Sequence, residues 1–477
     1  MTQRCGASVY LESLGCDKNK VDGEVMLGRL MEDGFSIVGD PGEARIIIVN
    51  TCGFIKEAIE ESIETILNLA AYKEKEICGL LVVVGCMTER YRDQIHAEMP
   101  EIDLVLGVAD RDEIVNRLRS AMQPNLSNES PPRKNLPQAN TIQYRLLARE
   151  NTPNPHIAYV KIAEGCDNRC AYCTIPKIRG RYRSRPQSEI MEECMALVND
   201  GVRELILVAQ DTASYGVDLC GKPRLAELLR KLDANFGTNC SEVVRVRLLY
   251  AYPEHITPEL IDAIAELPSV CKYLDMPIQH SEDTTLARMG RRGTRSALED
   301  LIRRLRKQIP EITLRTTLMV GFPGETNEEF RALYGFVKDI RFDRLGVFPY
   351  SREEDTPAVT MPKQVKSEIK HIRRDRIMAL QQKIHMKKQR EKLGKPLEAM
   401  VDGEAPSADD SPFFSETDGS SYRYIGRAQS DAPEVDSVIY ISSERKLSPG
   451  QVVTVIPVSA DEYDLQGREV HTHEPAE

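Results

Sequence analysis

The sequence predicts an α/β protein built from three domains. Strand-like and helix-like segments alternate over most of its 477 residues, which are too many for one ordinary hydrophobic core. Residues 123–140 are rich in Pro, Asn and Ser, and short β-like runs begin after Gly394-Lys395-Pro396. We therefore expect an N-terminal domain at 1–122, a linker at 123–150, a central domain at 151–392, a C-terminal domain at 393–463 and a tail at 464–477.

The first domain is expected to contain an open, mainly parallel sheet. Strand-like apolar runs occupy residues 8–14, 45–50 and 80–85. Between them, Ile59, Ile63, Ile66 and Ala70 recur at helical spacing, which predicts an amphipathic helix over residues 56–72. Strands that alternate with helices favour a parallel sheet.

The central domain is expected to form a partial (βα)6 barrel. Helical patterns separate six strand-like runs, at residues 156–163, 205–209, 244–250, 272–276, 312–320 and 343–348. In a barrel of this kind, chemistry takes place at the carboxyl ends of the strands. The basic, Gln-rich helical stretch at 366–390 is expected to be an exposed connector to the last domain.

The C-terminal domain is expected to be a small antiparallel β-barrel with an acidic surface. Between Lys395 and Asp461 the sequence has twelve acidic and five basic side chains, so this segment carries −7 of the chain's net charge of −11. An acidic barrel would repel phosphates and attract a basic protein. An ordinary solvated acidic face is the alternative. The acidic positions are 398, 402, 404, 409, 410, 416, 418, 431, 434, 436, 444 and 461.

Composition and chain ends predict a cytoplasmic protein with no membrane partner. The longest apolar runs, at 46–49 and 80–84, are far shorter than a membrane span. The N-terminus lacks the basic and then apolar pattern of a secretory signal. We therefore expect the twelve cysteines to serve as metal ligands or catalytic groups rather than disulfides.

A group of three cysteines, Cys166, Cys170 and Cys173, follows the first strand of the central domain with C-x3-C-x2-C spacing. Three thiolates can hold three irons of a cubane cluster and leave the fourth iron open to a small-molecule chelate. The alternative is a zinc site, which usually needs four ligands in paired spacing. The downstream cysteines at 194, 220, 240 and 271 are scattered singly, which disfavours zinc.

A second group, Cys16, Cys52 and Cys86, follows three successive strands of the first domain, and each cysteine lies next to a glycine. The carboxyl ends of parallel strands line one crevice, so these thiols are expected to converge and hold a second cluster. The alternative is three buried free cysteines. Cys5 and Cys78 do not follow strands and are expected not to be ligands.

The C-x3-C-x2-C loop, with Tyr172 before its third cysteine, resembles the radical S-adenosylmethionine superfamily. The resemblance implies that Tyr172 lies near the adenine. It also implies that Gly321 and Gly324 belong to an adenine-contacting strand end and that Gln210 ends another strand at the same face. Arg315 is expected either to contact the cofactor or a substrate carboxylate, or to form a structural ion pair. The basic run at 179–185 beside the triad is either an anion-binding or RNA-binding segment or a solvated loop.

The predicted layout, two clusters with three protein ligands each, resembles that of the methylthiotransferase family. The resemblance covers nearly the whole chain. Stretches at 13–22 (SLGCDKNKVD), 273–280 (YLDMPIQH) and 342–354 (FDRLGVFPYSREE) resemble its RimO-type branch, although Asp17 stands where that branch usually has Pro. The resemblance implies methylthiolation of an aspartate β-carbon in protein twelve of the small ribosomal subunit. It implies two [4Fe–4S] clusters, S-adenosyl-L-methionine, an electron donor such as flavodoxin or ferredoxin, and only secondary RNA contact. The alternative is the MiaB-type branch, which modifies an adenosine in transfer RNA.

Overall fold

The computed structural model describes residues 6–122, 154–239, 243–406 and 422–470. The chain separates into two compact units, and each is described by itself. The first contains Met1–Pro155, Tyr159–Asp200 and Ser351–Val359, and the second contains His156–Ala158, Gly201–Tyr350 and Thr360–Glu477. The expected linker at 123–150 lies outside the described residues.

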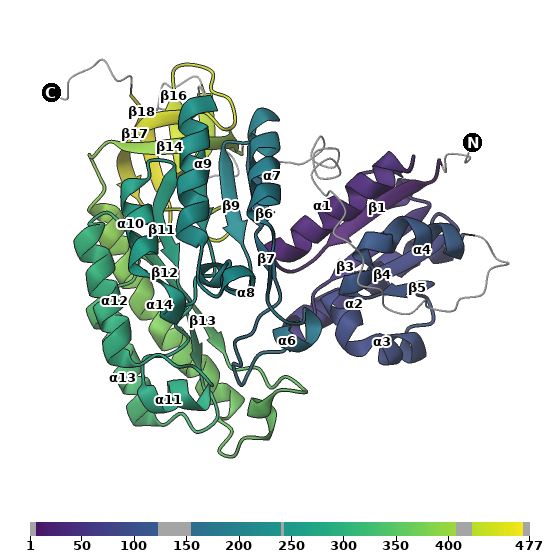
Figure 1. Ribbon diagram of the computed structural model, residues 1–477, viewed down its shortest axis with the longest axis horizontal. Helices are drawn as coiled ribbons and strands as arrows, with labels where there is room; N and C mark the ends of the chain where they lie inside the picture. Colours follow the sequence, from purple (N-terminus) through teal and green to yellow (C-terminus); the bar gives the residue numbers. More distant parts are fainter. Residues whose placement is uncertain (1–5, 123–153, 240–242, 407–421, 471–477) are drawn as a thin grey trace. The chain divides into compact units, whose positions relative to one another are not determined.

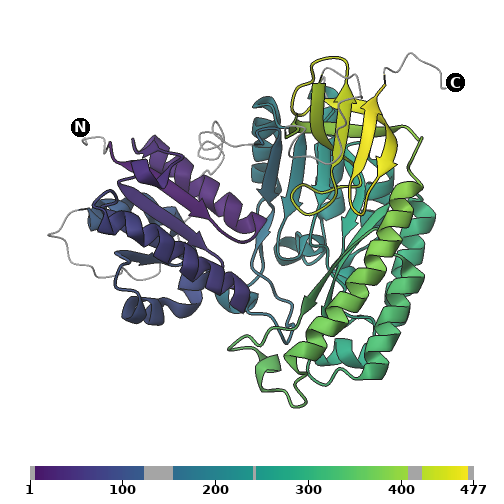
Figure 2. The ribbon, with the colours of Figure 1, turned by 180° about the vertical axis from the view of Figure 1, so that it is seen from behind.

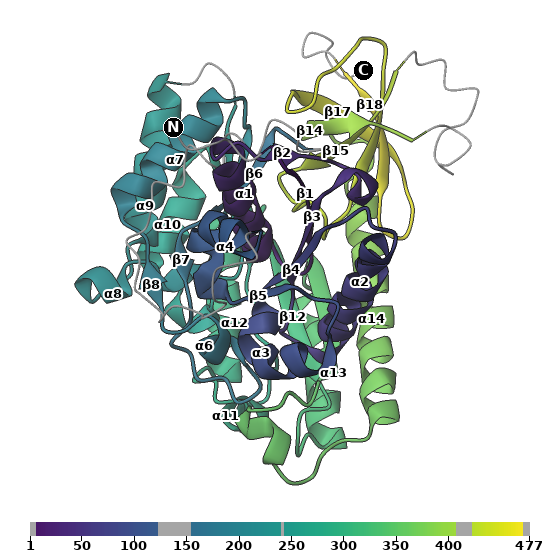
Figure 3. The same cartoon turned by 90° about the vertical axis from the view of Figure 1, so that its right-hand side faces the viewer.

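The N-terminal part of the first unit is a five-stranded parallel sheet in the order β2-β1-β3-β4-β5, with helices on both faces (Figures 1 and 3). Its strands are β1 (Ser8–Ser13), β2 (Ser36–Ile37), β3 (Ile46–Thr51), β4 (Leu80–Gly85) and β5 (Leu104–Leu106). Its helices are α1 (Asp17–Glu32), α2 (Lys56–Glu74), α3 (Cys86–Glu98) and α4 (Ile114–Ala121). The central strands β3 and β4 are buried throughout, because helices cover both sides of a parallel sheet. The expected parallel α/β domain is confirmed.

The central sheet has six strands in the order β13-β12-β11-β10-β9-β6, and its two edge strands do not pair with each other. The expected partial barrel is therefore confirmed. Its strands are β6 (Ile157–Lys161), β9 (Glu204–Val208), β10 (Arg245–Leu248), β11 (Val270–Asp275), β12 (Thr313–Val320) and β13 (Arg344–Pro349). The longer helices are α7 (Gln187–Asn199), α9 (Leu225–Asn239), α10 (Pro258–Glu266), α12 (Arg295–Gln308), α13 (Asn327–Ile340) and α14 (Ser367–Arg390). The short helices are α6 (Ile175–Ile178), α8 (Val217–Cys220) and α11 (Asp283–Arg288).

The C-terminal domain is a closed five-stranded barrel in the order β14-β15-β16-β18-β17. Its strands are β14 (Leu397–Glu404), β15 (Tyr422–Ala428), β16 (Ile439–Ser443), β17 (Val452–Ala460) and β18 (Leu465–Glu469). All pairings are antiparallel as expected except that of β16 with β18, which is parallel. The tail was expected to begin at residue 464, but β18 lies beyond that boundary and closes the barrel. The expected boundary is therefore wrong.

The prediction that residues 366–390 are an exposed connector is wrong. Helix α14 packs along β13 and α13 (Figure 2), and several of its polar side chains are buried. Lys370 donates to the carbonyl of Tyr350 at 2.6 Å, and Gln381 donates to the carbonyl of Phe342 at 2.9 Å. Long polar side chains can therefore cover a sheet edge while their ends find backbone partners. Among the described residues, no helix combines the length and apolar character needed to cross a membrane.

Buried ion pairs join the C-terminal barrel to the amino ends of the central strands. Glu204, the first residue of β9, contacts Arg247 at 2.6 Å and Arg427 of β15 at 2.8 Å. Arg344, the first residue of β13, pairs with Asp431 of the C-terminal domain. These contacts fix the C-terminal barrel at the end of the sheet opposite to the carboxyl ends of its strands.

Replacement of Glu204 by Gln is expected to lower the free energy of unfolding by about 3–5 kcal/mol, because Arg247 would remain buried without its carboxylate partner and Arg427 would keep only Asp402. Urea unfolding followed by circular dichroism would measure the loss. Glu227 provides the control, since it pairs with Arg224 on an exposed helix turn. Glu227→Gln should cost no more than about 1 kcal/mol. Equal effects of the two changes would contradict this account.

The contribution of Glu204 should also depend on pH. Burial alone would raise the pKa of its carboxyl, but Arg247 and Arg427 overcome this effect and lower the pKa from 4.5 to about 2. The stabilisation is therefore complete above about pH 4.5 and is lost as the pH falls towards 2. We expect the stability difference between the wild-type chain and Glu204→Gln to narrow between pH 6 and pH 3. A difference that stays constant over this range would rule out the ionised pair.

Candidate metal centre

The structure brings Cys16, Cys52 and Cys86 together at the carboxyl edge of the N-terminal sheet. They follow β1, β3 and β4, which are neighbours in that sheet. A Cβ atom placed on Gly15 would lie 2.9 Å from the Sγ of Cys52, and one placed on Gly53 would lie 2.7 Å from the carbonyl carbon of Cys86. Charges on Cys16 and Cys52 would each raise the pKa of Cys86, which places all three thiols within electrostatic range of one another.

Glycine is required beside these cysteines because the strand ends approach so closely. Gly15 and Gly85 have φ values of +87° and +115°, which L side chains rarely adopt. A Cβ on Gly85 would lie 2.5 Å from the carbonyl oxygen of Thr51. Larger residues would push the strand ends and their cysteines apart.

Two of the three thiols lie at helix amino ends. Cys16 is the N-cap residue of α1, and Cys86 is the first residue of α3. The partial positive charge at the amino end of a helix favours a nearby negative charge. Burial nevertheless raises the pKa of Cys86 to about 11, although Arg179 acts in the opposite direction. The protonated thiol is thus the stable form until a metal displaces the proton.

Cys166, Cys170 and Cys173 occupy one loop, which is closed by the paired strands β7 (Ala163–Glu164) and β8 (Arg183–Ser184). The N–H of Cys166 donates to the carbonyl of Gly180 at 3.2 Å, and that of Cys173 donates to the carbonyl of Cys170 at 3.1 Å. All three thiols are partly exposed. Burial, followed by the neighbouring Cys170 and Cys166, raises the pKa of Cys173 to about 12. The loop therefore presents three closely spaced sulfur ligands.

Within the described part of the chain, no three His, Cys, Asp or Glu side chains are arranged to hold a single metal ion. A cubane places each thiolate on a different iron, so its ligands need not converge on one point. Each group of three sulfurs fits a cubane on chemical grounds, since thiolates are the ligands that iron–sulfur clusters take. Cys78 donates to the carbonyl of Leu80 at 3.2 Å and does not join either triad, and Cys5 lies outside the described residues.

The other residues predicted to bind a cofactor are found at several places. Tyr172 is half-buried within the triad loop, Gln210 follows β9, and Gly321 follows β12. The N–H of Gly321 donates to Glu325 at 2.5 Å, and that of Gly324 donates to the carbonyl of Lys363 at 2.9 Å. The N–H of Gly321 therefore already serves the turn and that of Gly324 a distant segment, and a role for the two glycines in adenine binding stays a prediction.

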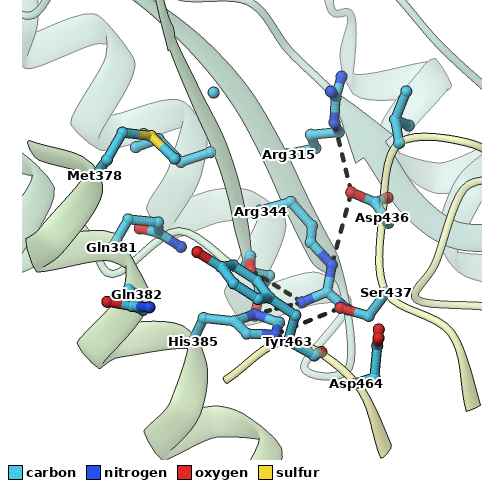
Figure 4. A pocket seen from close by; sticks show the side chains of 14 residues that line it. Arg315, Arg344, Met378, Gln381, Gln382, His385, Asp436, Ser437, Tyr463 and Asp464 are labelled. Atoms are coloured by element: carbon cyan, nitrogen blue, oxygen red, sulfur yellow. Dashed lines mark hydrogen bonds and ion pairs between the residues drawn. The ribbon is translucent and has the colours of Figure 1, made fainter. Parts of the chain in front are cut away.

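Arg315 has the contacts of a structural ion pair, the second of the two roles predicted for it. Its guanidinium lies 3.3 Å from Asp275 and 3.6 Å from Asp436 of the C-terminal domain. Figure 4 shows Arg315 directed at Asp436 in a cavity of about 320 Å³ that α14, β13 and the C-terminal barrel also line. None of the six triad cysteines lines this cavity. A contact of Arg315 with the cofactor or a substrate carboxylate, the other role, stays a prediction.

A buried ion network beside the triads could not be predicted from the sequence. Arg179 contacts Asp22 at 2.7 Å and Glu164 at 3.1 Å, and Lys161 contacts both carboxylates at 2.5 Å. Arg111 also pairs with Asp22. Arg179 belongs to the basic run at 179–185, and Asp22 ends the conspicuous stretch at 13–22. Nothing in the sequence indicated that these two segments meet.

Three family models together match most of the chain. Residues 8–107 match the uncharacterised protein family UPF0004, residues 160–337 match the radical SAM superfamily, and residues 393–470 match the TRAM domain.

Similar proteins extend over nearly the full length. Ribosomal protein uS12 methylthiotransferase RimO from Acetivibrio thermocellus is 45% identical over 97% of this chain and 98% of that protein. The protein of the same name from Desulfitobacterium hafniense is 43% identical over 98% and 100%. Among solved structures, the radical S-adenosylmethionine methyltransferase TsrM from Kitasatospora setae aligns with a TM-score of 0.53 at 15% identity, over 72% of this chain and 73% of that one. The cobalamin-dependent radical enzyme OxsB aligns with a TM-score of 0.51 at 12% identity, over 80% and 56%. These structures support the fold alone.

Single Cys→Ala changes should remove one cluster at a time. We expect anaerobically reconstituted Cys52→Ala and Cys166→Ala chains each to hold about half the iron and sulfide of the wild-type chain, because the ligand sets are separate. Iron and sulfide assays with visible absorbance would measure this. Cys78→Ala is the matched control and should bind as much as the wild-type chain. Full iron content in either triad variant would contradict the ligand assignment.

Proposed function

The chain belongs to the RimO family of radical S-adenosylmethionine methylthiotransferases, and on that basis we propose that it adds a methylthio group to ribosomal protein uS12. We further propose that the acceptor is the β-carbon of an aspartate. Similarity to enzymes of this name over nearly the whole chain, at 42–45% identity, is the observation that carries the proposal. The two cysteine triads in one compact unit support it.

The proposed ligands of one [4Fe–4S] cluster are Cys166, Cys170 and Cys173. Those of the second are Cys16, Cys52 and Cys86. When bound, the clusters and S-adenosylmethionine supply reductive cleavage and the sulfur and methyl groups that are transferred. The triad loop, through Tyr172, and the strand ends near Gln210 and Gly321 are the proposed contacts of S-adenosylmethionine.

The protein itself holds the two ligand sets in fixed places. Closely packed strand ends position the first domain's thiols, and the β7–β8 pair closes the loop that carries the other three. The group of ion pairs around Asp22 connects α1 to the segment that bears this loop, since Asp22 contacts both Lys161 and Arg179. Within this group, the side chains of Asp22 and Arg179 are almost fully buried. This arrangement supports a reaction in which two separate metal sites act in turn.

The surface charge of the C-terminal domain supports a protein substrate less strongly than the sequence analysis predicted. Of the twelve acidic residues counted in the C-terminal segment, Asp402, Asp431 and Asp436 pair with arginines inside the second unit. Their charges are neutralised and do not attract a basic partner. The acidic positions 409, 410, 416 and 418 lie outside the described residues. The choice of uS12 therefore depends on the relatives, and the matching TRAM domain favours secondary RNA contact.

A one-electron donor such as flavodoxin or ferredoxin completes the proposal, because reductive cleavage consumes an electron from outside the chain.

Deletion of the gene should remove the methylthio mass shift from uS12 and leave transfer RNA unchanged. Mass spectrometry of ribosomal proteins and of digested transfer RNA would measure both. Complementation with the wild-type or Cys78→Ala chain should restore the modification, whereas Cys166→Ala should not. Loss of an RNA modification with uS12 unaltered would instead support the MiaB-type alternative.

A further inference from the structure

Arg179 belongs to the segment that carries one cysteine triad and contacts a cysteine of the other. It directly follows the short helix α6, which begins two residues after Cys173. Its side chain is only 1% exposed, and its Nη2 lies 3.3 Å from the Sγ of Cys86 and 3.1 Å from the Oδ1 of Asn19. A residue from the loop of one triad therefore donates to a ligand of the other.

The charges around Arg179 favour a negatively charged sulfur at Cys86. Three cations, Arg179, Lys161 and Arg111, surround two carboxylates, Asp22 and Glu164. The buried guanidinium of Arg179 touches both carboxylates and then points its second nitrogen at Cys86. Arg111 also contacts Asp112 at 3.4 Å, so the negative charge of a thiolate at Cys86 would act most directly on Arg179, the cation that it touches. A charge-assisted hydrogen bond of this kind is stronger than a neutral one.

We propose that Arg179 raises the reduction potential of the cluster held by Cys16, Cys52 and Cys86 by keeping the positive charge of its guanidinium next to the Cys86 sulfur. Hydrogen bonds to cluster sulfurs and nearby charge are established means by which proteins set such potentials. An electron added to the cluster makes it more negative, so an adjacent cation favours the reduced form. Arg179 is a positioning residue here, and the inference depends on the proposed function only in requiring a cluster at this triad.

The test uses the full-length chain in which Cys166, Cys170 and Cys173 are all replaced by Ala, so that only the N-terminal cluster absorbs. Potentiometric titration with dithionite gives its midpoint potential, with electron paramagnetic resonance as the second readout. Arg179→Gln should make reduction at least tenfold less favourable, a shift of about 59 mV to lower potential for one electron. Arg179→Lys keeps the charge and should shift the potential less than Gln does.

Asp22→Asn gives a test of sign. This change removes a negative charge that faces Arg179, so it should raise the potential, opposite to Arg179→Gln. A purely structural loosening would move both variants in the same direction, and that result would overturn the inference. If Arg179→Gln does not retain its cluster, the Asp22→Asn result decides: a higher potential supports the inference, and an unchanged or lower one overturns it.

The two proposals fail in distinguishable ways. A loaded N-terminal cluster whose potential is the same in the parent and Arg179→Gln chains overturns the role of Arg179 alone. A parent chain that binds no iron at Cys16, Cys52 and Cys86 overturns the ligand assignment and this inference together. The complete holoenzyme should show the same shift in one of its two clusters, and equal shifts in both would also contradict a local effect of Arg179.

Discussion

The site depends on one constraint of parallel sheets, which is that neighbouring strands deliver their carboxyl ends to the same edge. Cys16, Cys52 and Cys86 are separated by more than thirty residues in sequence, yet they follow adjacent strands. Glycines at these ends allow the backbones to approach to distances that any Cβ would prevent. The convergence of the three sulfurs is therefore a consequence of strand order and residue size. No local cysteine motif is needed.

Buried charge is the second principle of the structure, and it acts in both units. In the first, the carboxylate of Asp22 is surrounded by Lys161, Arg111 and Arg179, which hold its pKa far below its ordinary value despite burial. In the second, Glu204 is shared by two arginines. Such networks are costly to bury and costly to break, since removal of one member leaves its partners without compensation. They favour one arrangement of the segments they join, which a reaction with two metal sites requires.

The sequence predicted those features that depend on the order of neighbouring residues along the chain. The spacing within Cys166–Cys173 and the position of each N-terminal cysteine after a strand indicated which cysteines to propose as the two ligand sets, because strand ends can be recognised from apolar runs. It did not predict where Arg179 points. A basic run in a sequence is interpreted as solvated when the carboxylates that pair with it are not known. Such carboxylates come from distant segments of the chain. The burial of helix α14 was not predicted for a related reason, because its polar side chains donate to the backbone carbonyls of Phe342 and Tyr350, which flank β13. Strand β18 was missed because it lies among charged and polar residues near the chain end.

The central claim is that two sulfur ligand sets in one compact unit perform different tasks. Its most direct test is product analysis of the Cys52→Ala chain, incubated with S-adenosylmethionine, reductant and uS12. The account predicts that 5′-deoxyadenosine still forms, because Cys166, Cys170 and Cys173 are intact, while uS12 gains no methylthio group. Absence of 5′-deoxyadenosine although the cluster at Cys166, Cys170 and Cys173 is fully loaded would contradict the division of tasks.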